Sequence, residues 1–365
     1  MRSSRAKNRI DEPLLYGYLL TLVIGLVMVY SASSMLAESR FGSHLYFFRQ
    51  QLLWAVLSGV AIYIISLLDL KRLAVYSAPA LLFTLLLLSL VFVMPARNQA
   101  QRWLMLGPLT IQPSELFKGL MIFYLAFSLS NPKRNLSNLK ELIFPYVPII
   151  GLGLGLILVE PDLGTSIVIF VTAMGMFFLA GARVKHLILA VVPPAVLGSF
   201  VVFGLGYKQT RILNYFEAVF EPLKGGYHVK QAALTLGSGG LLGTGLGDGR
   251  QKLFFLPYPH TDFILASMGE EIGFIGLTFV LGLLFLLLWR GCRIAAGQPD
   301  KFGYLLAAGM TWSLFVNIAI NAGVVSAILP VTGLALPFLS YGGSSLLISS
   351  AAIGVLINLS RRVKQ

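Results

Sequence analysis

The sequence is poor in charge and holds a single cysteine. Charged residues make up only 12% of its 365 residues, whereas hydrophobic residues make up 56%. The lone Cys292 excludes an intramolecular disulfide, so the fold cannot depend on oxidation. With a mean hydropathy of +0.80, the composition is typical of a polytopic membrane protein and nearly excludes a soluble one.

Several motifs of soluble proteins are missing as well. The four histidines show no ligand spacing, no Ser-His-Asp arrangement is apparent, and there is no GxxxxGK[ST] motif. The net charge of +13 is spread over short loops, which argues against a nucleic-acid-binding face. Seven glycines lie within 237–249. We interpret this stretch as a flexible hinge, with backbone amides for a pyrophosphate as the alternative.

Long apolar runs dominate what is present. Windows of about 19 residues predict ten membrane-spanning helices, at 14–34, 50–68, 75–94, 116–130, 143–159, 164–180, 186–205, 263–289, 303–327 and 340–360. A basic segment precedes the first run, as in a signal peptide. The length of that run suits a spanning helix of ~20 residues better than a cleaved segment of ~7 to 15. We therefore expect an all-α integral membrane protein, with residues 1–365 as a single polytopic domain.

Basic residues alternate between the two sides of the predicted spans. With the N-terminus inside, the inner segments hold seventeen basic residues and the short outer loops hold four. This pattern predicts that both termini are cytoplasmic. The connection between spans 7 and 8, 206–262, then becomes a large extracytoplasmic loop. Apolar spacing within it predicts short amphipathic helices at 209–220 and 227–236.

Carboxylates beside the apolar runs are the main candidates for function, because a charge at the bilayer centre costs ~3 kcal/mol. Asp262 follows Thr261, which is expected to cap a helix with Asp262 in its first turn. The helix dipole would stabilise an acid there whatever its role, but the interfacial depth also suits a general base. Glu270 and Glu271 point about 100° apart. We expect them to support the structure, paired with Lys or Arg of neighbouring helices.

Other polar residues have two open interpretations each. Glu115 and Lys118 have the spacing of a same-face ion pair, but Lys118 can also hold a phosphate at the outer leaflet. Arg102 can reach an anionic head group. Asp162 either lines the mouth of a cavity or ends helices in water. A stripe on the ninth predicted span indicates interhelical hydrogen bonds or a substrate groove: Ser313, Asn317 and Asn321.

Four sequence blocks resemble the SEDS family (shape, elongation, division and sporulation), the bacterial FtsW and RodA proteins. In order, they are QRWLMLGPLTIQPSELFK, EPDLGTS, GGYHVKQAALTLGSGGLLGTGLGDGRQKLFFLPYPHTDFILASMGEE and LPVTGLALPFLSYGGSS. Together they extend over nearly the whole chain. FLAGAR and RQKLFFLPYPHTDF resemble the division and sporulation (FtsW) branch more than the elongation (RodA) branch.

The resemblance implies a peptidoglycan glycosyltransferase that polymerises lipid II on the outer face of the cytoplasmic (inner) membrane, for cell division or shape. It implies that Asp262 is catalytic. The expected substrate or pyrophosphate contacts are Arg102, Glu115, Lys118, Asp162, His260 and Lys252.

No metal ligand is predicted, although a divalent cation (Mg²⁺ or Mn²⁺) is an open alternative for holding pyrophosphate. The implied partners are lipid II and a class B penicillin-binding protein transpeptidase, with no nucleic acid. Two other functions stay open: a lipid II flippase and a non-catalytic scaffold of the division complex. A translocator needs polar groups through the whole membrane depth, whereas the acids here gather at the predicted outer side.

Overall fold

The computed structural model is a helical bundle, and it describes residues 10–94, 101–107, 109–134, 138–199, 204, 226–249 and 256–363. Its helices are α1 (Glu12–Phe41), α2 (Tyr46–Leu67), α3 (Leu70–Val75), α4 (Ser77–Val91), α5 (Pro113–Leu129), α6 (Leu139–Ile143), α7 (Tyr146–Val159), α8 (Leu163–Leu179), α9 (Val184–Ser199), α11 (Tyr227–Ser238), α12 (Ile264–Ala296), α13 (Lys301–Val325) and α14 (Gly343–Ser360). One antiparallel hairpin pairs β1 (Leu104–Leu106) with β2 (Leu109–Ile111). The all-α prediction therefore needs this one correction.

Each of the ten predicted apolar runs overlaps one of these helices. Within the described part of the chain, α1, α2, α12, α13 and α14 are long and apolar enough to cross a membrane. Four further apolar helices are shorter: α4, α7, α8 and the first part of α9. Several membrane-crossing helices are thus confirmed, while the count of ten spans stays a prediction.

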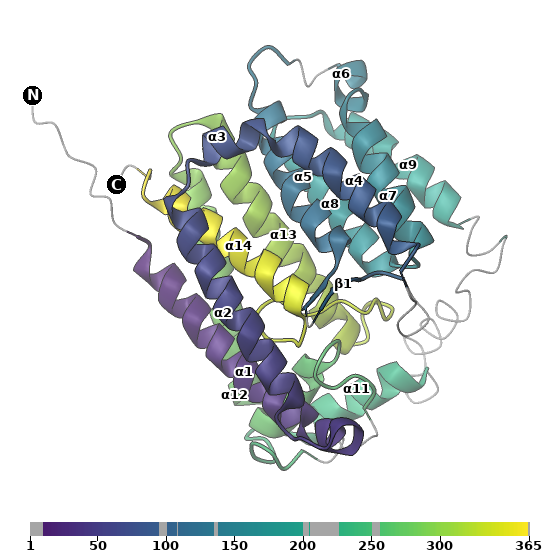
Figure 1. Ribbon diagram of the computed structural model, residues 1–365, viewed down its shortest axis with the longest axis vertical. Helices are drawn as coiled ribbons and strands as arrows, with labels where there is room; N and C mark the ends of the chain where they lie inside the picture. Colours follow the sequence, from purple (N-terminus) through teal and green to yellow (C-terminus); the bar gives the residue numbers. More distant parts are fainter. Residues whose placement is uncertain are drawn as a thin grey trace, which may run out of the picture.

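Helix α13 occupies the middle of the bundle. It packs against α12 and α14 on one side and against α5 and α8 on the other, as Figure 1 shows. Helices α1, α2, α12 and α14 form the first group, in which α14 lies along α2 and α1 lies along α12. Helices α4, α5, α7 and α8 form the second group. Asp262 lies directly before α12 of the first group, and α13 contributes a hydrogen bond to its backbone.

At one end of the bundle, three helices are tied together through Asp11. Its side chain caps α1 by accepting a hydrogen bond from the Leu14 N–H at 3.0 Å. The same carboxylate accepts a hydrogen bond from Arg290 Nε, also at 3.0 Å, near the end of α12. The Asp11 N–H donates to the hydroxyl of Ser360 at the end of α14, at 3.2 Å. The start of α1 is therefore fixed to the ends of two other helices.

Helix α12 is broken at Gly273, whose φ of 65° and ψ of −173° are not helical. A segment that we call the glycine strap, residues 239–249, fills the break. Four backbone hydrogen bonds join the two: Thr244 N–H to Glu270 C=O (2.9 Å), Gly245 N–H to Glu271 C=O (3.1 Å), Phe274 N–H to Gly240 C=O (2.9 Å) and Ile275 N–H to Leu241 C=O (3.2 Å). The strap thus satisfies polar groups that the break would leave unpaired.

Close backbone approach explains the glycines of the strap. A Cβ atom on Gly239 would lie 2.0 Å from the Gly269 carbonyl oxygen, and one on Gly243 would lie 2.3 Å from that of Glu271. The stretch is therefore a docked segment, so its interpretation as a flexible hinge is wrong. Helix α11, which leads into the strap, occupies the second of the two predicted loop helices. The first, at 209–220, lies outside the described residues.

Candidate functional site

Asp262 lies in the turn that precedes α12. The helix begins at Ile264 with Phe263 as its N-cap, and no side chain caps it. The Thr261 hydroxyl points back and donates to the Tyr258 carbonyl at 3.3 Å. The prediction that Thr261 caps the helix with Asp262 in its first turn is therefore wrong, because the chain closes a tight turn onto Tyr258 before the helix begins.

Hydrogen bonds from two other segments hold the backbone of the Asp262 turn in place. Helix α13 supplies Asn321, and the segment before α14 supplies Ser340 and Tyr341. The bonds are Asn321 Nδ2 to Asp262 C=O (3.1 Å), Ser340 Oγ to Thr261 C=O (2.6 Å) and Tyr341 N–H to His260 C=O (2.8 Å). Asn321 also donates to the Leu334 carbonyl at 2.7 Å. Asn321 thus bonds to carbonyls of loop residues rather than to another helix, and the two interpretations of the polar stripe, interhelical hydrogen bonds or a substrate groove, both stay predictions.

The Asp262 carboxyl has a raised proton affinity. Burial is the main cause, a nearby Asp162 adds to it, and Thr261 and Arg102 oppose it, so that the pKa is about 6. A carboxyl with this pKa is mostly ionised at neutral pH and still accepts a proton more readily than an ordinary aspartate, as a general base must. Gly333 leaves space beside it, since a Cβ there would lie 3.6 Å from Asp262 Oδ2.

Arg102 and Asp162 form a second corner of the site. Arg102 Nε donates to the Glu160 carbonyl at 3.0 Å, its Nη2 donates to the Pro161 carbonyl, and its Nη1 lies 3.9 Å from Asp162 Oδ1. Asp162 caps α8 through Thr165, whose N–H and hydroxyl donate at 3.2 and 2.9 Å. Asp162 therefore ends a helix, as one interpretation had it, but it does so while almost fully buried rather than in water.

Glu160 is an acid to which the sequence alone assigned no role. Its side chain is fully buried, and neither carboxyl oxygen has a hydrogen-bond partner among the described residues. Burial raises its pKa to about 8, with Asp162 adding to the rise and Arg102 opposing it. Glu160 is thus a neutral acid at pH 7. The sequence feature that could have indicated Glu160 is its position next but one to Asp162, since neighbouring carboxylates raise each other's pKa.

Glu115 and Lys118 form the predicted ion pair on α5. Lys118 Nζ lies 2.7 Å from Glu115 Oε2, and both side chains are buried. A pocket of about 20 Å³, room for about one water molecule, adjoins Lys118 and is partly lined by Ser313 and Asn317. These stripe residues therefore share a small pocket with Lys118. A contact between Lys118 and phosphate stays a prediction.

His260 packs beside the Asp262 turn, whereas Glu271 lies further along α12, next to the break at Gly273. The His260 ring packs against those of Phe47 and Tyr341, at centroid distances of 4.7 and 5.7 Å, and these two rings also contact each other. Burial, helped by the charge of Arg40, lowers the pKa of His260 to about 4, so the ring is neutral at pH 7. The buried Glu271 carboxylate accepts hydrogen bonds from the Ser31 hydroxyl at 2.7 Å and from the Gly247 N–H at 3.1 Å.

The buried Glu270 lies on the same helix turn, where its backbone carbonyl accepts a hydrogen bond from the strap. Lys252 lies outside the described residues. Among those that are described, no three His, Cys, Asp or Glu side chains lie close enough together to hold a metal ion. The divalent cation, which the sequence left as an open alternative, stays a prediction, and we assign no step to one.

Comparison with known proteins identifies relatives over the full length of the chain. The FtsW, RodA and SpoVE family model, described as "Cell cycle protein", matches residues 12–365. Stage V sporulation protein E of Bacillus subtilis is 41% identical over 349 residues, covering 94% of each chain. A probable peptidoglycan glycosyltransferase FtsW of Geobacter metallireducens is 39% identical over 343 residues, covering 93% of this chain and 92% of the relative.

Solved structures share the fold. A chain from the structure described as "Structural coordination of polymerization and crosslinking by a peptidoglycan synthase complex" matches with a TM-score of 0.79 and 28% identity, covering 96% of this chain and 98% of that one. The rod shape determining protein RodA of Thermus thermophilus matches with a TM-score of 0.71 and 27% identity, covering 98% of each chain. The protein is therefore a multi-pass membrane protein with a RodA-like fold, and it belongs to the FtsW, RodA and SpoVE family.

Proposed function

We propose that this protein is a peptidoglycan glycosyltransferase that polymerises lipid II on the outer face of the cytoplasmic membrane. The observation that carries the proposal is Asp262, a carboxyl with a pKa near 6 that Asn321 and Ser340 hold in place through its backbone turn. The charges of Arg102 and Asp162 act on the same carboxyl. Relatives named as probable peptidoglycan glycosyltransferases support the reaction class.

The proposed reaction joins a 4-hydroxyl of one N-acetylglucosamine to the anomeric carbon of a second lipid II. A C–O bond forms at that carbon while its bond to the lipid pyrophosphate breaks, and Asp262 takes the hydroxyl proton. The pyrophosphate leaves with the electron pair of the broken bond, and a cationic side chain stabilises the developing charge. Arg102 is the first candidate, because about a fifth of its side chain is exposed beside this corner. Lys118 and Lys252 are further proposed cations, and the neutral His260 is a further proposed contact.

The same proposal includes the orientation of the protein in the membrane, its branch of the family and its protein partner. Ten spans with both termini cytoplasmic, and an extracytoplasmic loop at 206–262, would place Asp262 at the outer face of the inner membrane; the alternation of basic residues supports this. Relatives named FtsW and stage V sporulation protein E support the division and sporulation branch. A class B penicillin-binding protein is the proposed partner. Similarity to a chain of a complex that coordinates polymerisation and crosslinking supports it.

Purified protein reconstituted with lipid II tests the reaction. Asp262→Asn is expected to lower glycan polymer formation by about 10² to 10⁴-fold, the usual contribution of a general base. Glu38→Gln is the matched control, because Glu38 is an exposed acid near the end of α1. Lipid translocation without polymer would favour the flippase instead. Polymer formation that is unchanged in Asp262→Asn would contradict a catalytic role for this residue.

A further inference from the structure

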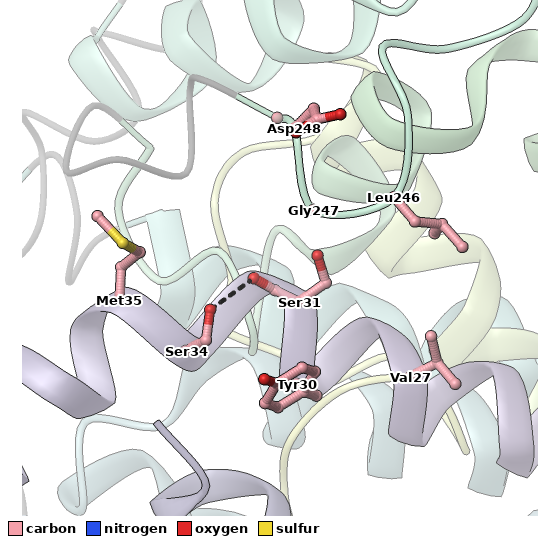
Figure 2. A pocket seen from close by; sticks show the side chains of 9 residues that line it. Val27, Tyr30, Ser31, Ser34, Met35, Leu246, Gly247 and Asp248 are labelled. Carbon is pink, nitrogen blue, oxygen red and sulfur yellow. Dashed lines mark hydrogen bonds between the residues drawn. The ribbon is translucent and has the colours of Figure 1, made fainter. Parts of the chain in front are cut away.

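A cavity of about 620 Å³ lies between the C-terminal half of α1 and the glycine strap. Helix α1 and the strap form opposite walls, as Figure 2 shows, and the lining residues are Val27, Tyr30, Ser31, Ser34, Met35, Leu246, Gly247, Asp248 and Gly249. Its volume falls in the range of about 300 to 1,000 Å³ that is typical of small-molecule sites. None of the described residues around Asp262 lines it. The cavity is therefore separate from the candidate active site.

The two walls are joined behind the cavity by Glu271. This carboxylate is only 2% exposed, and it accepts hydrogen bonds from Ser31 on α1 and from the Gly247 N–H on the strap. The backbone bonds between the strap and α12 fix the second wall further. A ligand would therefore find a largely formed site, which reduces the ordering cost of binding.

The lining joins hydrocarbon and polar groups. Val27, Met35 and Leu246 present apolar side chains, with exposures of 46, 48 and 62%. Hydroxyls come from Tyr30, Ser31 and Ser34. The exposed apolar side chains of α1 continue along the helix, through Tyr16, Leu20 and Val23. This face has the character of a lipid-facing surface, so the cavity opens sideways towards the bilayer. An amphiphile that enters from the membrane fits such a site.

Charge narrows the choice of amphiphile. Asp248 is exposed at the rim, its carboxylate has no partner among the described residues, and no described lining residue is basic. Among the described lining residues, an anionic head group or a pyrophosphate would find no countercharge, whereas an ammonium group would be attracted to the carboxylate of Asp248. The lining therefore favours a zwitterionic lipid with a primary amine over the pyrophosphate-bearing substrate.

We propose that this cavity binds one zwitterionic aminophospholipid, with an acyl chain against Val27, Met35 and Leu246 and its ammonium group at Asp248. Assignment to the outer leaflet rests on the proposed orientation, but the binding itself does not depend on glycosyltransferase activity. Because the lipid would contact both walls, it would stabilise the docked strap by mass action.

Native mass spectrometry of the purified chain, incubated with equal amounts of phosphatidylethanolamine, phosphatidylcholine and phosphatidylglycerol, tests the proposal. One phosphatidylethanolamine per chain is expected to be retained. Val27→Trp fills the cavity and should lower its occupancy about ten-fold, since losing contact with two or three methylene groups suffices for that. Val23→Trp is the matched control, on the same exposed face but outside the cavity.

Two further variants keep the test decisive. Met35→Trp fills the cavity from an exposed position, in case Val27→Trp fails to fold, and Asp248→Asn should remove the preference for the amine-bearing lipid. Asp262→Asn, which tests the reaction, should retain the lipid as the unmodified chain does. Equal retention by the filled variants and the Val23→Trp control would overturn the proposal. The proposal would also be overturned if the lipid that the cavity-filling variants lose were phosphatidylglycerol and not phosphatidylethanolamine.

Discussion

At the scale of single residues, three acids in one region behave differently because their surroundings differ. Asp162 is engaged by Gln112 and Thr165 as a helix cap. Glu160, with no partner in the described residues, holds its proton at neutral pH. Asp262 has a smaller rise than Glu160, to a pKa of about 6. Their order along the chain does not distinguish these roles, but burial and hydrogen bonding do.

The rate of polymer formation should depend on pH through Asp262. A general base must be deprotonated, so the rate is expected to fall about ten-fold per pH unit below a pKa of about 6 and to level off above it. His260 does not titrate in this window, because its pKa is about 4, and Glu160 remains protonated up to a pKa of about 8. Initial rates between pH 5 and 7.5 measure the profile, and a flat profile would contradict the assignment.

Glu160 makes the stability of the fold depend on pH. Its pKa is raised from 4.5 to about 8 on folding, so the folded chain keeps a proton that the unfolded chain releases, and stability is lost as pH rises through this window. Glu160→Gln cannot ionise. The variant should match the unmodified protein in melting temperature near pH 5 and exceed it increasingly towards pH 8.

Thermal unfolding in detergent at several pH values measures this difference. Glu38→Gln, a change at an exposed acid, should show no such divergence. A melting-temperature difference between Glu160→Gln and the unmodified protein that stays constant from pH 5 to 8 would contradict a neutral buried Glu160.

At the scale of elements, hydropathy located the helices but not their irregularities. Each apolar run became a helix because an apolar segment in lipid must satisfy its own backbone. The break in α12 was not predictable, since one glycine inside an apolar run is compatible with a continuous helix. Gly273 breaks α12 in the structure, where the docked strap supplies non-local hydrogen bonds. The hairpin β1–β2 escaped prediction because its strands have three residues each.

Two glycines of the strap should differ in their tolerance of alanine. Gly240 and Gly243 both have positive φ, so alanine costs ~1 to 2 kcal/mol of backbone strain at either position. A Cβ on Gly240 would meet nothing within 4 Å, whereas one on Gly243 would clash with the Glu271 backbone. Gly240→Ala should therefore lower the melting temperature by a few degrees, and Gly243→Ala by considerably more. Equal losses would contradict the docked position of the strap.

At the scale of the whole molecule, the sequence indicated the catalytic candidate but not its surroundings. Asp262 was identifiable because it precedes a long apolar run and lies in a block that resembles the family. Its electrostatic coupling to Asp162 and Arg102 joins segments that are 100 and 160 residues away in the chain. Such proximity depends on how helices pack around α13, and local pattern does not determine that.

Cys292 reports the orientation of the molecule. It is an exposed cysteine near the end of α12, two residues after Arg290, which is hydrogen-bonded to Asp11 at the start of α1. With the proposed topology, a membrane-impermeant maleimide should label Cys292 only after the cells are permeabilised. A Cys292→Ser chain that carries Leu242→Cys on the strap, a site that is 81% exposed, should react in intact cells. Labelling of Cys292 but not of the cysteine at position 242 in intact cells would contradict the proposed topology.

The break at Gly273 has a mechanical consequence for the whole of α12. A continuous helix resists bending through its own ladder of hydrogen bonds, but this 33-residue helix has lost that ladder at one point. The strap is hydrogen-bonded to the helix on both sides of the break and so holds the two parts of α12 in a fixed arrangement. The glycine strap therefore sets the stiffness of α12 at the point that separates Asp262 from the rest of the helix. If the strap were pulled away, α12 would be free to bend at Gly273.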